Sequence, residues 1–200
     1  SDIGLFTSNN LLTEEINQLF NAMMSNSIGA NYNSLIVAPN NMRQKFFSLI
    51  DNEITNAKFG KPSRIIAKMN QLEDDQIITK LKEASSAGVQ IQLLVRGFCC
   101  LRPGVKNSTE NISVQSTIGR FLEHSRIYYF ANASTEPIRG NWFIGSADWM
   151  KRSFDKRIEL IVPVVDDRAK DKLFEILNIY LDDKKNSWDL NPNGTYTRST

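Results

Sequence analysis

The chain has 200 residues, of which 41% are hydrophobic and 23% are charged, as is ordinary for a soluble globular protein. No apolar run approaches the ~18 residues needed to cross a bilayer, and the first residues lack the basic region of a signal peptide, so we expect a cytoplasmic protein. Two adjacent cysteines, Cys99 and Cys100, and one histidine exclude a disulfide framework and a zinc site. We expect both thiols to be small, mostly buried groups at the end of a strand.

The first half of the chain predicts alternating strands and helices. Short apolar runs indicate strands, and acids or asparagines before longer apolar patterns indicate helix starts. The expected elements are a strand over 1–7, a helix from Thr13 to about Met24, a strand over 34–39, a helix capped by Asn40 or Asn41 and ending near 58–62, a strand over 63–70, a helix from Asp74 closed by Gly88, and a strand over 89–97.

In the second half of the chain the alternation of strands and helices stops, because the expected strands follow one another without long helices between them. The expected strands cover 112–117, 126–130, 141–146 and 157–165, and a last helix runs from Asp166 through Tyr180. This pattern predicts an α/β fold with a mixed, mostly parallel sheet flanked by helices. We expect a helical lead-in over 1–30, one domain over 31–185 and a mobile polar tail over 186–200.

Basic side chains are concentrated in the middle of the sequence. Residues 96–157 contain ten lysines and arginines but five acids, an excess of +5, whereas the whole chain has a net charge of +2. Such an excess around the single histidine, His124, favours an anionic ligand, although a solvated basic face explains it equally well.

Polar residues stand at the ends of several predicted strands, where ligands bind in open α/β sheets. An arginine fork binds phosphate oxygens, and a histidine, with an ordinary pKa of ~6.5, acts as a nucleophile or a proton donor near neutral pH. Each such residue alone is more often structural, but several together favour a phosphate site. The candidates are Lys68, Asn70, Arg96, His124, Arg126 and Ser146.

Other motifs narrow the chemistry. The sequence has no Walker-type G-x-x-x-x-G-K-[ST] and no G-x-G-x-x-G after a strand, so a phosphotransferase of this sequence does not use a P-loop. Arg102, in a turn before Pro103, either reaches the same anion or is simply exposed. The aromatic residues near the histidine are expected to pack in the core rather than to stack on a base: Tyr128, Tyr129, Trp142 and Trp149.

Four segments together resemble the C-terminal part of bacterial polyphosphate kinases. They are AKMNQLED, LLVRGFCCLRPGV, STENISVQSTIGRFLEHSRIYYF and IGSADWMKRSFDKRIEL, and the resemblance extends from about residue 1 to 185. It implies a phospholipase D-like half-domain, in a fold where two similar halves each supply a histidine to one cleft. It also implies transfer of the terminal phosphoryl group of ATP to polyphosphate, reversibly.

The resemblance assigns roles to residues of this chain. His124 corresponds to the second active-site histidine, a general acid/base or a stabiliser of the transferred phosphoryl group, and Arg96 to the arginine that binds nucleotide phosphate. The phosphorylated histidine and the Mg²⁺ ligands belong to segments absent here, so we expect no metal site and an inactive fragment. ATP, ADP and polyphosphate are the implied partners, without nucleic acid, in a homo-oligomeric full-length protein.

The sequence departs from the wider phospholipase D pattern in ways that this kinase family shares. Arg126 replaces the lysine of H-x-K, and Ala131 stands where an aspartate would fall. These departures disfavour phosphodiester hydrolysis and leave Glu159 and Asp148 as candidates to orient His124. Two alternatives remain: a phosphodiesterase or nuclease in which two identical chains each contribute a histidine, and a non-catalytic module that binds polyanions.

Overall fold

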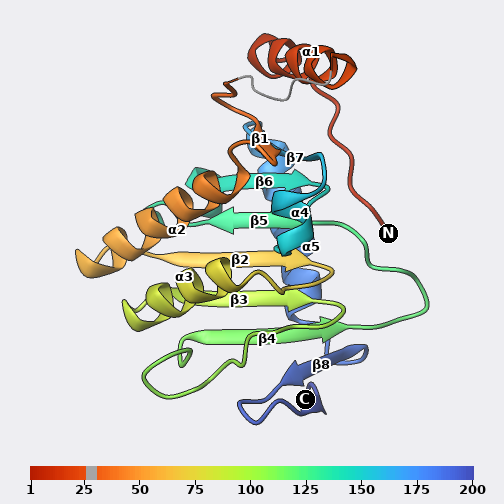
Figure 1. The fold of residues 1–200 in the computed structure, drawn as a ribbon. Helices are drawn as coiled ribbons and strands as arrows, with labels where there is room; N and C mark the ends of the chain where they lie inside the picture. Colours follow the sequence, from red (N-terminus) through yellow and green to blue (C-terminus); the bar gives the residue numbers. More distant parts are fainter. Residues whose placement is uncertain (26–30) are drawn as a thin grey trace.

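The computed structural model describes residues 1–25 and 31–200, and its central feature is one mixed β-sheet (Figure 1). Within these residues the strand order is β1-β7-β6-β5-β2-β3-β4-β8-β9. The strands are β1 Ile36–Ala38, β2 Arg64–Met69, β3 Gln90–Val95, β4 Ile112–Thr117, β5 Ile127–Phe130, β6 Asn141–Gly145, β7 Glu159–Val164, β8 Ser187–Leu190 and β9 Tyr196–Arg198. The helices are α1 Asn10–Met24, α2 Met42–Lys58, α3 Asp75–Ser86, the 3-10 turn η1 Pro137–Arg139, α4 Lys151–Asp155 and α5 Asp167–Leu181.

Helices cover both faces of the sheet, which confirms the α/β class. Figure 1 shows α2 and α3 in front of the sheet and α5 behind it. Apolar side chains of α2 and α3, such as Phe46 and Leu81, pack in one core with one face of the strands. Leu173 and Leu177 of α5 belong to a second core on the other face. No described helix is long and apolar enough to span a membrane.

Helix α1 lies apart from these layers and packs against the β1 end of the sheet. Leu12 and Leu19 of α1 share a small core with Leu35 and Val37. The buried Glu15 carboxylate accepts hydrogen bonds from the backbone N–H groups that precede β1, including that of Leu35 at 2.8 Å. The expected lead-in over 1–30 therefore contains a docked helix, and its residues 26–30 lie outside the described part of the chain.

The expectation of a mostly parallel sheet is wrong. Of the strand pairs in the described residues, β2–β3 and β3–β4 are parallel and the remaining pairs are antiparallel. The predicted strand–helix–strand unit β2–α3–β3 does give a parallel pair. The connection from β5 to β6, residues 131–140, is shorter than a parallel crossover needs, so these two strands reverse direction. The longer connection from β6 to β7, which contains α4, also leads to an antiparallel neighbour.

Both ends of the chain differ from their predictions. Residues 1–9 form no strand. Helix α1 begins at Asn10 rather than Thr13, because the Asn9 side chain accepts a hydrogen bond from Leu12 N at 3.2 Å and caps the helix. The tail that we expected to be mobile forms the β8–β9 hairpin, which extends the sheet beyond β4.

The aromatic residues near the histidine pack in the core, as predicted. Tyr128, Tyr129, Trp142 and Trp149 are all buried. Tyr128 and Trp149 stack with ring centroids 5.2 Å apart, and the Tyr128 hydroxyl donates to Ala147 O. This packing supports the edge of the sheet from which the polar strand ends project.

Candidate active site

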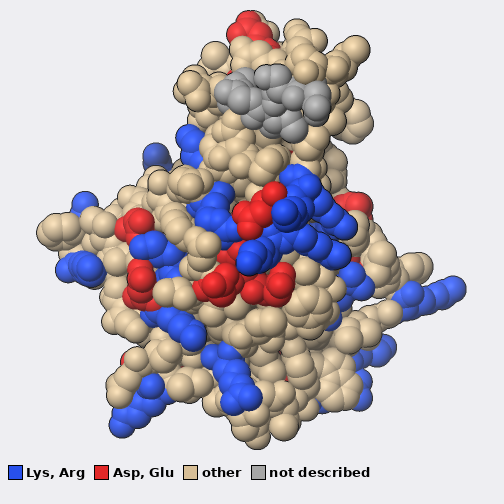
Figure 2. All heavy atoms as spheres, viewed as in Figure 1, with Lys and Arg blue, Asp and Glu red and all other residues tan. Residues whose placement is uncertain are grey.

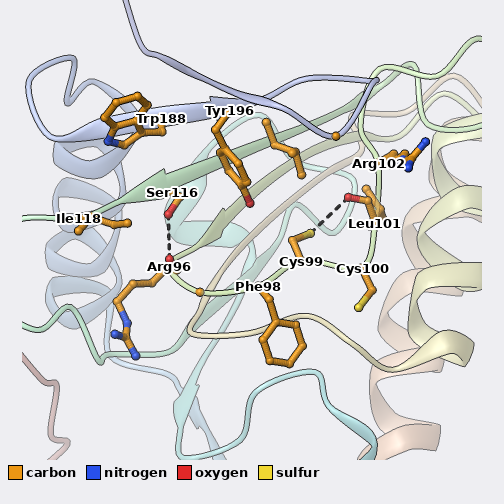
Figure 3. A pocket seen from close by; sticks show the side chains of 13 residues that line it. Arg96, Phe98, Cys99, Cys100, Leu101, Arg102, Ser116, Ile118, Trp188 and Tyr196 are labelled. Carbon is orange, nitrogen blue, oxygen red and sulfur yellow. Dashed lines mark hydrogen bonds between the residues drawn. The ribbon is translucent and has the colours of Figure 1, made fainter.

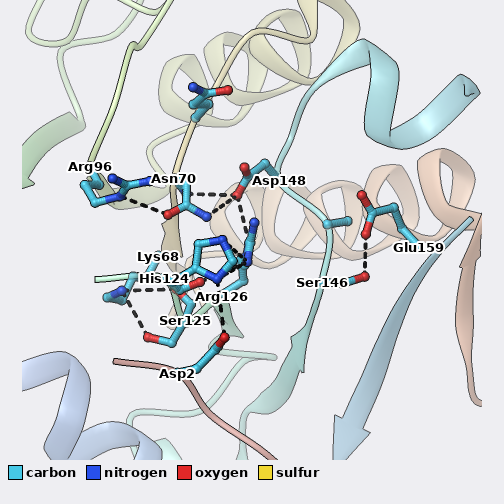
Figure 4. Close-up of polar contacts among 12 residues, drawn as sticks. Asp2, Lys68, Asn70, Arg96, His124, Ser125, Arg126, Ser146, Asp148 and Glu159 are labelled. Carbon is cyan, nitrogen blue, oxygen red and sulfur yellow. Dashed lines mark hydrogen bonds and ion pairs between the residues drawn. The ribbon is translucent and has the colours of Figure 1, made fainter. Parts of the chain in front are cut away.

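Polar residues from three strands meet at one edge of the sheet (Figure 4). Strands β2 and β3 run parallel, with Met69 opposite Val95, and β5 runs antiparallel to β2, with Ile127 opposite Lys68. The C-terminal ends of β2 and β3 therefore adjoin the start of β5. The residues that directly follow or precede these strand ends are Asn70, Arg96 and Arg126.

The Asp148 carboxylate connects these strand ends. Its Oδ1 atom accepts hydrogen bonds from Asn70 N at 2.8 Å, from Asn70 Nδ2 at 3.3 Å and from Arg126 Nε at 3.1 Å. The amide oxygen of Asn70 in turn accepts from Arg96 Nε at 3.0 Å. Because Asp148 and Asn70 are both buried, these charge-assisted bonds are weakly screened and fix the direction of two guanidinium groups.

Gly97 allows the ends of β2 and β3 to approach each other closely. A Cβ atom at this position would lie 2.9 Å from Asn70 O, nearer than side chains tolerate. The position must therefore be a glycine because the neighbouring backbone occupies the space of a side chain. Its absence of a side chain keeps Asn70 beside Arg96.

His124 and Arg126 both lie before β5, which begins at Ile127, one residue later than the strand expected over 126–130. Arg126 Nη1 is 3.2 Å from both ring nitrogens of His124 and donates to His124 O at 3.0 Å. An atom at this distance from both nitrogens would overlap other ring atoms if it lay in the plane of the ring. Nη1 of Arg126 therefore lies over the face of the imidazole. The His124 side chain is 42% exposed and is thus open to a ligand.

The carboxylate nearest to the imidazole is Asp2, which the sequence did not indicate. Its Oδ2 atom lies 3.3 Å from His124 Nδ1, and the hydrogen bond with His124 lowers the pKa of the Asp2 carboxyl. Neither predicted partner contacts the ring within the described residues. Asp148 binds Arg126 instead, and Glu159 binds Ser146.

Two candidates do not face the same space as the others. The Lys68 side chain is buried at 4% exposure, and its Nζ donates to the carbonyl and the hydroxyl of Ser125, both at 3.0 Å. The Ser146 hydroxyl donates to Glu159 and accepts from Leu160 N at 3.1 Å, and Figure 4 shows it apart from His124. Structure thus brings together Asn70, Arg96, His124 and Arg126, with Asp148 between them.

A larger, mostly apolar cavity of about 750 Å³ lies beside this cluster, between residues 96–102 and the β8–β9 hairpin (Figure 3). Phe98, Trp188 and Tyr196 line it. Arg96 forms part of its wall, but the Arg96 guanidinium turns away toward Asn70. This cavity therefore offers space and aromatic surface without the polar network.

The cysteines and Arg102 lie on the cavity side. Cys99 is half-buried and Cys100 is exposed, so the expectation that both are buried fails for Cys100. Burial raises the pKa of the Cys99 thiol to about 11, which disfavours its reactive thiolate. Arg102 is exposed near Gly194 and, in the described part of the chain, makes no hydrogen bond with the cluster around Asp148.

The described residues contain no group of three or more His, Cys, Asp or Glu side chains that could hold a metal ion. Asp148 already accepts from an arginine and an amide, and the cations around it oppose a further cation. The donor set therefore fits an anion such as a phosphate group rather than Mg²⁺.

Comparison with known proteins identifies the family. The sequence model of the family "Polyphosphate kinase C-terminal domain 2" matches residues 35–200 of this chain. The chain belongs to this family. A polyphosphate kinase from Synechocystis sp. is 48% identical over 198 residues, which cover 99% of this chain and 27% of that protein. The chain thus spans about a quarter of the length of the polyphosphate kinases that it matches.

Solved structures agree with this assignment. The crystal structure of polyphosphate kinase from Porphyromonas gingivalis matches with a TM-score of 0.90 and 36% identity, over 96% of this chain and 29% of that one. Nuc from Salmonella typhimurium, a phospholipase D family member, matches with a TM-score of 0.54 and 14% identity, over 79% of this chain and 98% of that one. The phospholipase D-like fold implied by the sequence is confirmed.

Proposed function

We propose that this chain is the C-terminal catalytic part of a polyphosphate kinase, which transfers the terminal phosphoryl group of ATP to inorganic polyphosphate and runs the reaction in reverse. The family match supports the activity. The observation that carries the role of this chain is the cluster of Arg96, Arg126 and His124 arranged around Asp148 at one sheet edge.

Each residue of the cluster has a role in this proposal. Arg96 and Arg126 bind phosphate oxygens and neutralise the charge of the group in transit, which is the main requirement of phosphoryl transfer. His124 donates or accepts a proton, or stabilises the transferred group, from its open position beside Arg126. Asn70 and Asp148 direct the arginines.

ATP would supply the phosphoryl group, and Mg²⁺, held by residues outside this chain, would neutralise part of the charge on its phosphates. We assign no Mg²⁺ ligand and no phosphorylated histidine to this chain, because its single histidine is His124. The full-length kinase is proposed to be a cytoplasmic homo-oligomer, with the domain over 31–185 as the phosphate-handling unit. The 187–198 hairpin joins the same sheet, so we extend this unit to include it.

The experiment is polyphosphate synthesis by the full-length kinase with His124→Ala. General acid/base catalysis contributes about 10²–10⁴-fold, so we expect a loss in that range. Glu14→Ala on the exposed face of α1 is the control and should leave the rate unchanged. Near-wild-type turnover of His124→Ala would remove the histidine from the site.

The isolated chain is expected to be inactive. Incubation with radioactive ATP should leave it unlabelled, since the phosphorylated histidine is proposed to lie elsewhere. Label that appears on this chain and disappears with His124→Ala would contradict the proposal.

A phosphodiesterase built from two copies of the chain is the second candidate, motivated by His124, Arg126 and Ser146. The hydrogen bonds of Ser146 to Glu159 and Leu160 disfavour it, since they direct the hydroxyl away from the histidine. Hydrolysis of a simple phosphodiester by a dimer of this chain would favour it over the kinase.

A further inference from the structure

His124 lies on a segment that regular secondary structure does not hold. Residues 118–126 form neither helix nor strand, and the imidazole is 42% exposed. A proton-transferring group must nevertheless stay within a few tenths of an ångström of its working position. The residues on each side of the histidine must therefore be held by contacts with other elements.

Ser125, which follows His124, is held from β2. Lys68 Nζ donates to the Ser125 carbonyl and to the Ser125 hydroxyl, both at 3.0 Å. Lys68 is 4% exposed and Ser125 is 3% exposed, so water competes little for these bonds. The backbone after the histidine is thus tied to the central strand of the site.

The side chain of Glu123, which precedes His124, is held from α5 and also accepts a hydrogen bond from the Ser1 hydroxyl. The Tyr180 hydroxyl donates to the Glu123 carboxylate. The ring of the same tyrosine lies under the Lys68 ammonium, with Nζ 4.6 Å from the ring centroid, in a cation–π contact. Lys68 and Tyr180 therefore contact each other and the two neighbours of His124.

The space around Lys68 is too small for a phosphate. The gap lined by Lys68, Arg96, Glu123 and Tyr180 measures about 10 Å³, roughly the volume that a single water needs. A buried amine with two hydrogen bonds and an aromatic face beneath it has no open side for a polyanion. This geometry argues against the direct phosphate contact expected from the sequence.

We propose that Lys68 and Tyr180 are positioning residues, which act together to fix His124 by holding Ser125 and Glu123 on either side of it. The inference rests on the proposed kinase function, in which His124 touches the transferred group. It assigns Lys68 to the support of the histidine and leaves Arg96 and Arg126 to bind the phosphate.

The charge of Lys68 depends on all the groups that face it. Burial lowers its pKa to about 8, against the raising effect of Glu123 and Asp2, while Arg126 and Arg96 lower it further. Above that pH the neutral amine still donates hydrogen bonds but loses their charge assistance and its attraction to the Tyr180 ring. The hold on Ser125 should therefore weaken as the pH rises through about 8.

The test is polyphosphate synthesis by the full-length kinase with Lys68→Met and with Tyr180→Phe. Tyr180→Phe keeps the ring and removes one hydroxyl, so it should fold even if Lys68→Met does not. We expect kcat to fall about tenfold to a hundredfold in each variant, as for a small misplacement of a catalytic group, with a smaller change in the KM for ATP.

Matched controls separate this effect from a general one. Lys80→Met removes a lysine of α3 that pairs with Asp51 and Glu83, and Tyr32→Phe removes a buried hydroxyl without a hydrogen-bond partner in the described residues. Both should leave kcat unchanged. A rise in the KM for ATP at constant kcat in Lys68→Met would instead assign Lys68 to phosphate binding and overturn the proposal.

A second readout does not depend on activity. His124 is the single histidine of this chain, so its imidazole gives one set of NMR signals, which should shift or broaden in Lys68→Met and Tyr180→Phe but not in the controls. If His124→Ala abolishes synthesis while both positioning variants behave like wild type, the positioning role fails and the kinase assignment stands. If His124→Ala is fully active, the role of His124 in the proposed function fails first.

Discussion

The cluster around Asp148 and the neighbouring apolar cavity share Arg96, yet they differ in almost every physical respect. The cavity is large, at about 750 Å³, and its walls include Phe98, Trp188 and Tyr196. In the cluster, a buried carboxylate directs two guanidinium groups. We therefore assign the proposed chemistry to the network of charged groups rather than to the larger apolar cavity.

Of the changes that test this comparison, replacement of Arg126 should reduce polyphosphate synthesis the most. Arg126 bridges Asp148 through Nε and His124 through Nη1. Arg126→Lys keeps the charge but replaces the planar guanidinium by a single ammonium, which cannot reproduce both contacts in the same geometry. We expect synthesis by the full-length kinase to fall about a hundredfold.

The control for this exchange is Arg157→Lys, on the exposed surface with its guanidinium 3.8 Å from Glu159. It should retain full activity. An Arg126→Lys variant as active as this control would show that the bridge to His124 is dispensable.

Loss of the Asp148 carboxylate should destabilise the cluster as a whole. Arg126 would keep its charge while 13% exposed and without its ion-pair partner. Asp148→Ala should lower the free energy of unfolding of this chain by about 3–5 kcal/mol, as measured with denaturant. Asp155→Ala, which breaks a more exposed pair with Arg43, should cost about 1 kcal/mol or less.

The stability of the chain should also depend on the charge of Lys68. Between its lowered pKa of about 8 and the ordinary value of 10.5, the unfolded chain binds a proton that the folded chain does not. The contribution of Lys68 to stability therefore rises with pH through this window. When thermal unfolding is measured at a series of pH values, the stability of Lys68→Met should rise less across this window than that of the wild-type chain. Identical slopes of stability against pH for the wild type and the variant would contradict the prediction.

The apolar cavity should matter least for catalysis. Tyr196→Ala removes an aromatic wall of the cavity from the β8–β9 hairpin without touching the Asp148 network. We expect the kcat of the full-length kinase to change by less than about twofold, since surface changes away from a site are usually small. A loss of kcat as large as that of Arg126→Lys would indicate that the active site lies at the cavity instead of at the Asp148 network.

The sequence predicted the members of the cluster that follow a simple rule of topology. Asn70 and Arg96 directly follow neighbouring parallel strands, and Arg126 directly precedes the strand beside them, so their meeting follows from the order of elements. The positions of Lys68 and Ser146 follow the same rule, but their side chains bind Ser125 and Glu159 instead. Side-chain direction depends on packing partners that a strand-end pattern does not contain.

Other features had no local signal. Asp2 reaches His124 across 122 positions of sequence, and Tyr180 looked like one more apolar residue of the last helix. The hairpin over 187–198 is polar and was expected to be mobile. It is ordered because the exposed edge of β4 offers backbone hydrogen bonds that do not depend on hydrophobic side chains.

Calorimetry of short-chain polyphosphate with this chain tests the central claim most directly, with Arg96→Ala compared to Arg102→Ala. Both arginines line the cavity, but within the described residues Arg96 alone is tied to Asp148 through Asn70. At low salt we expect Arg96→Ala to bind polyphosphate at least about tenfold more weakly than the wild-type chain, and Arg102→Ala to bind about as tightly as the wild type. At higher salt, the wild-type chain and both variants should all bind more weakly. Equal losses in the two variants would contradict the claim that the Asp148 network forms the phosphate site.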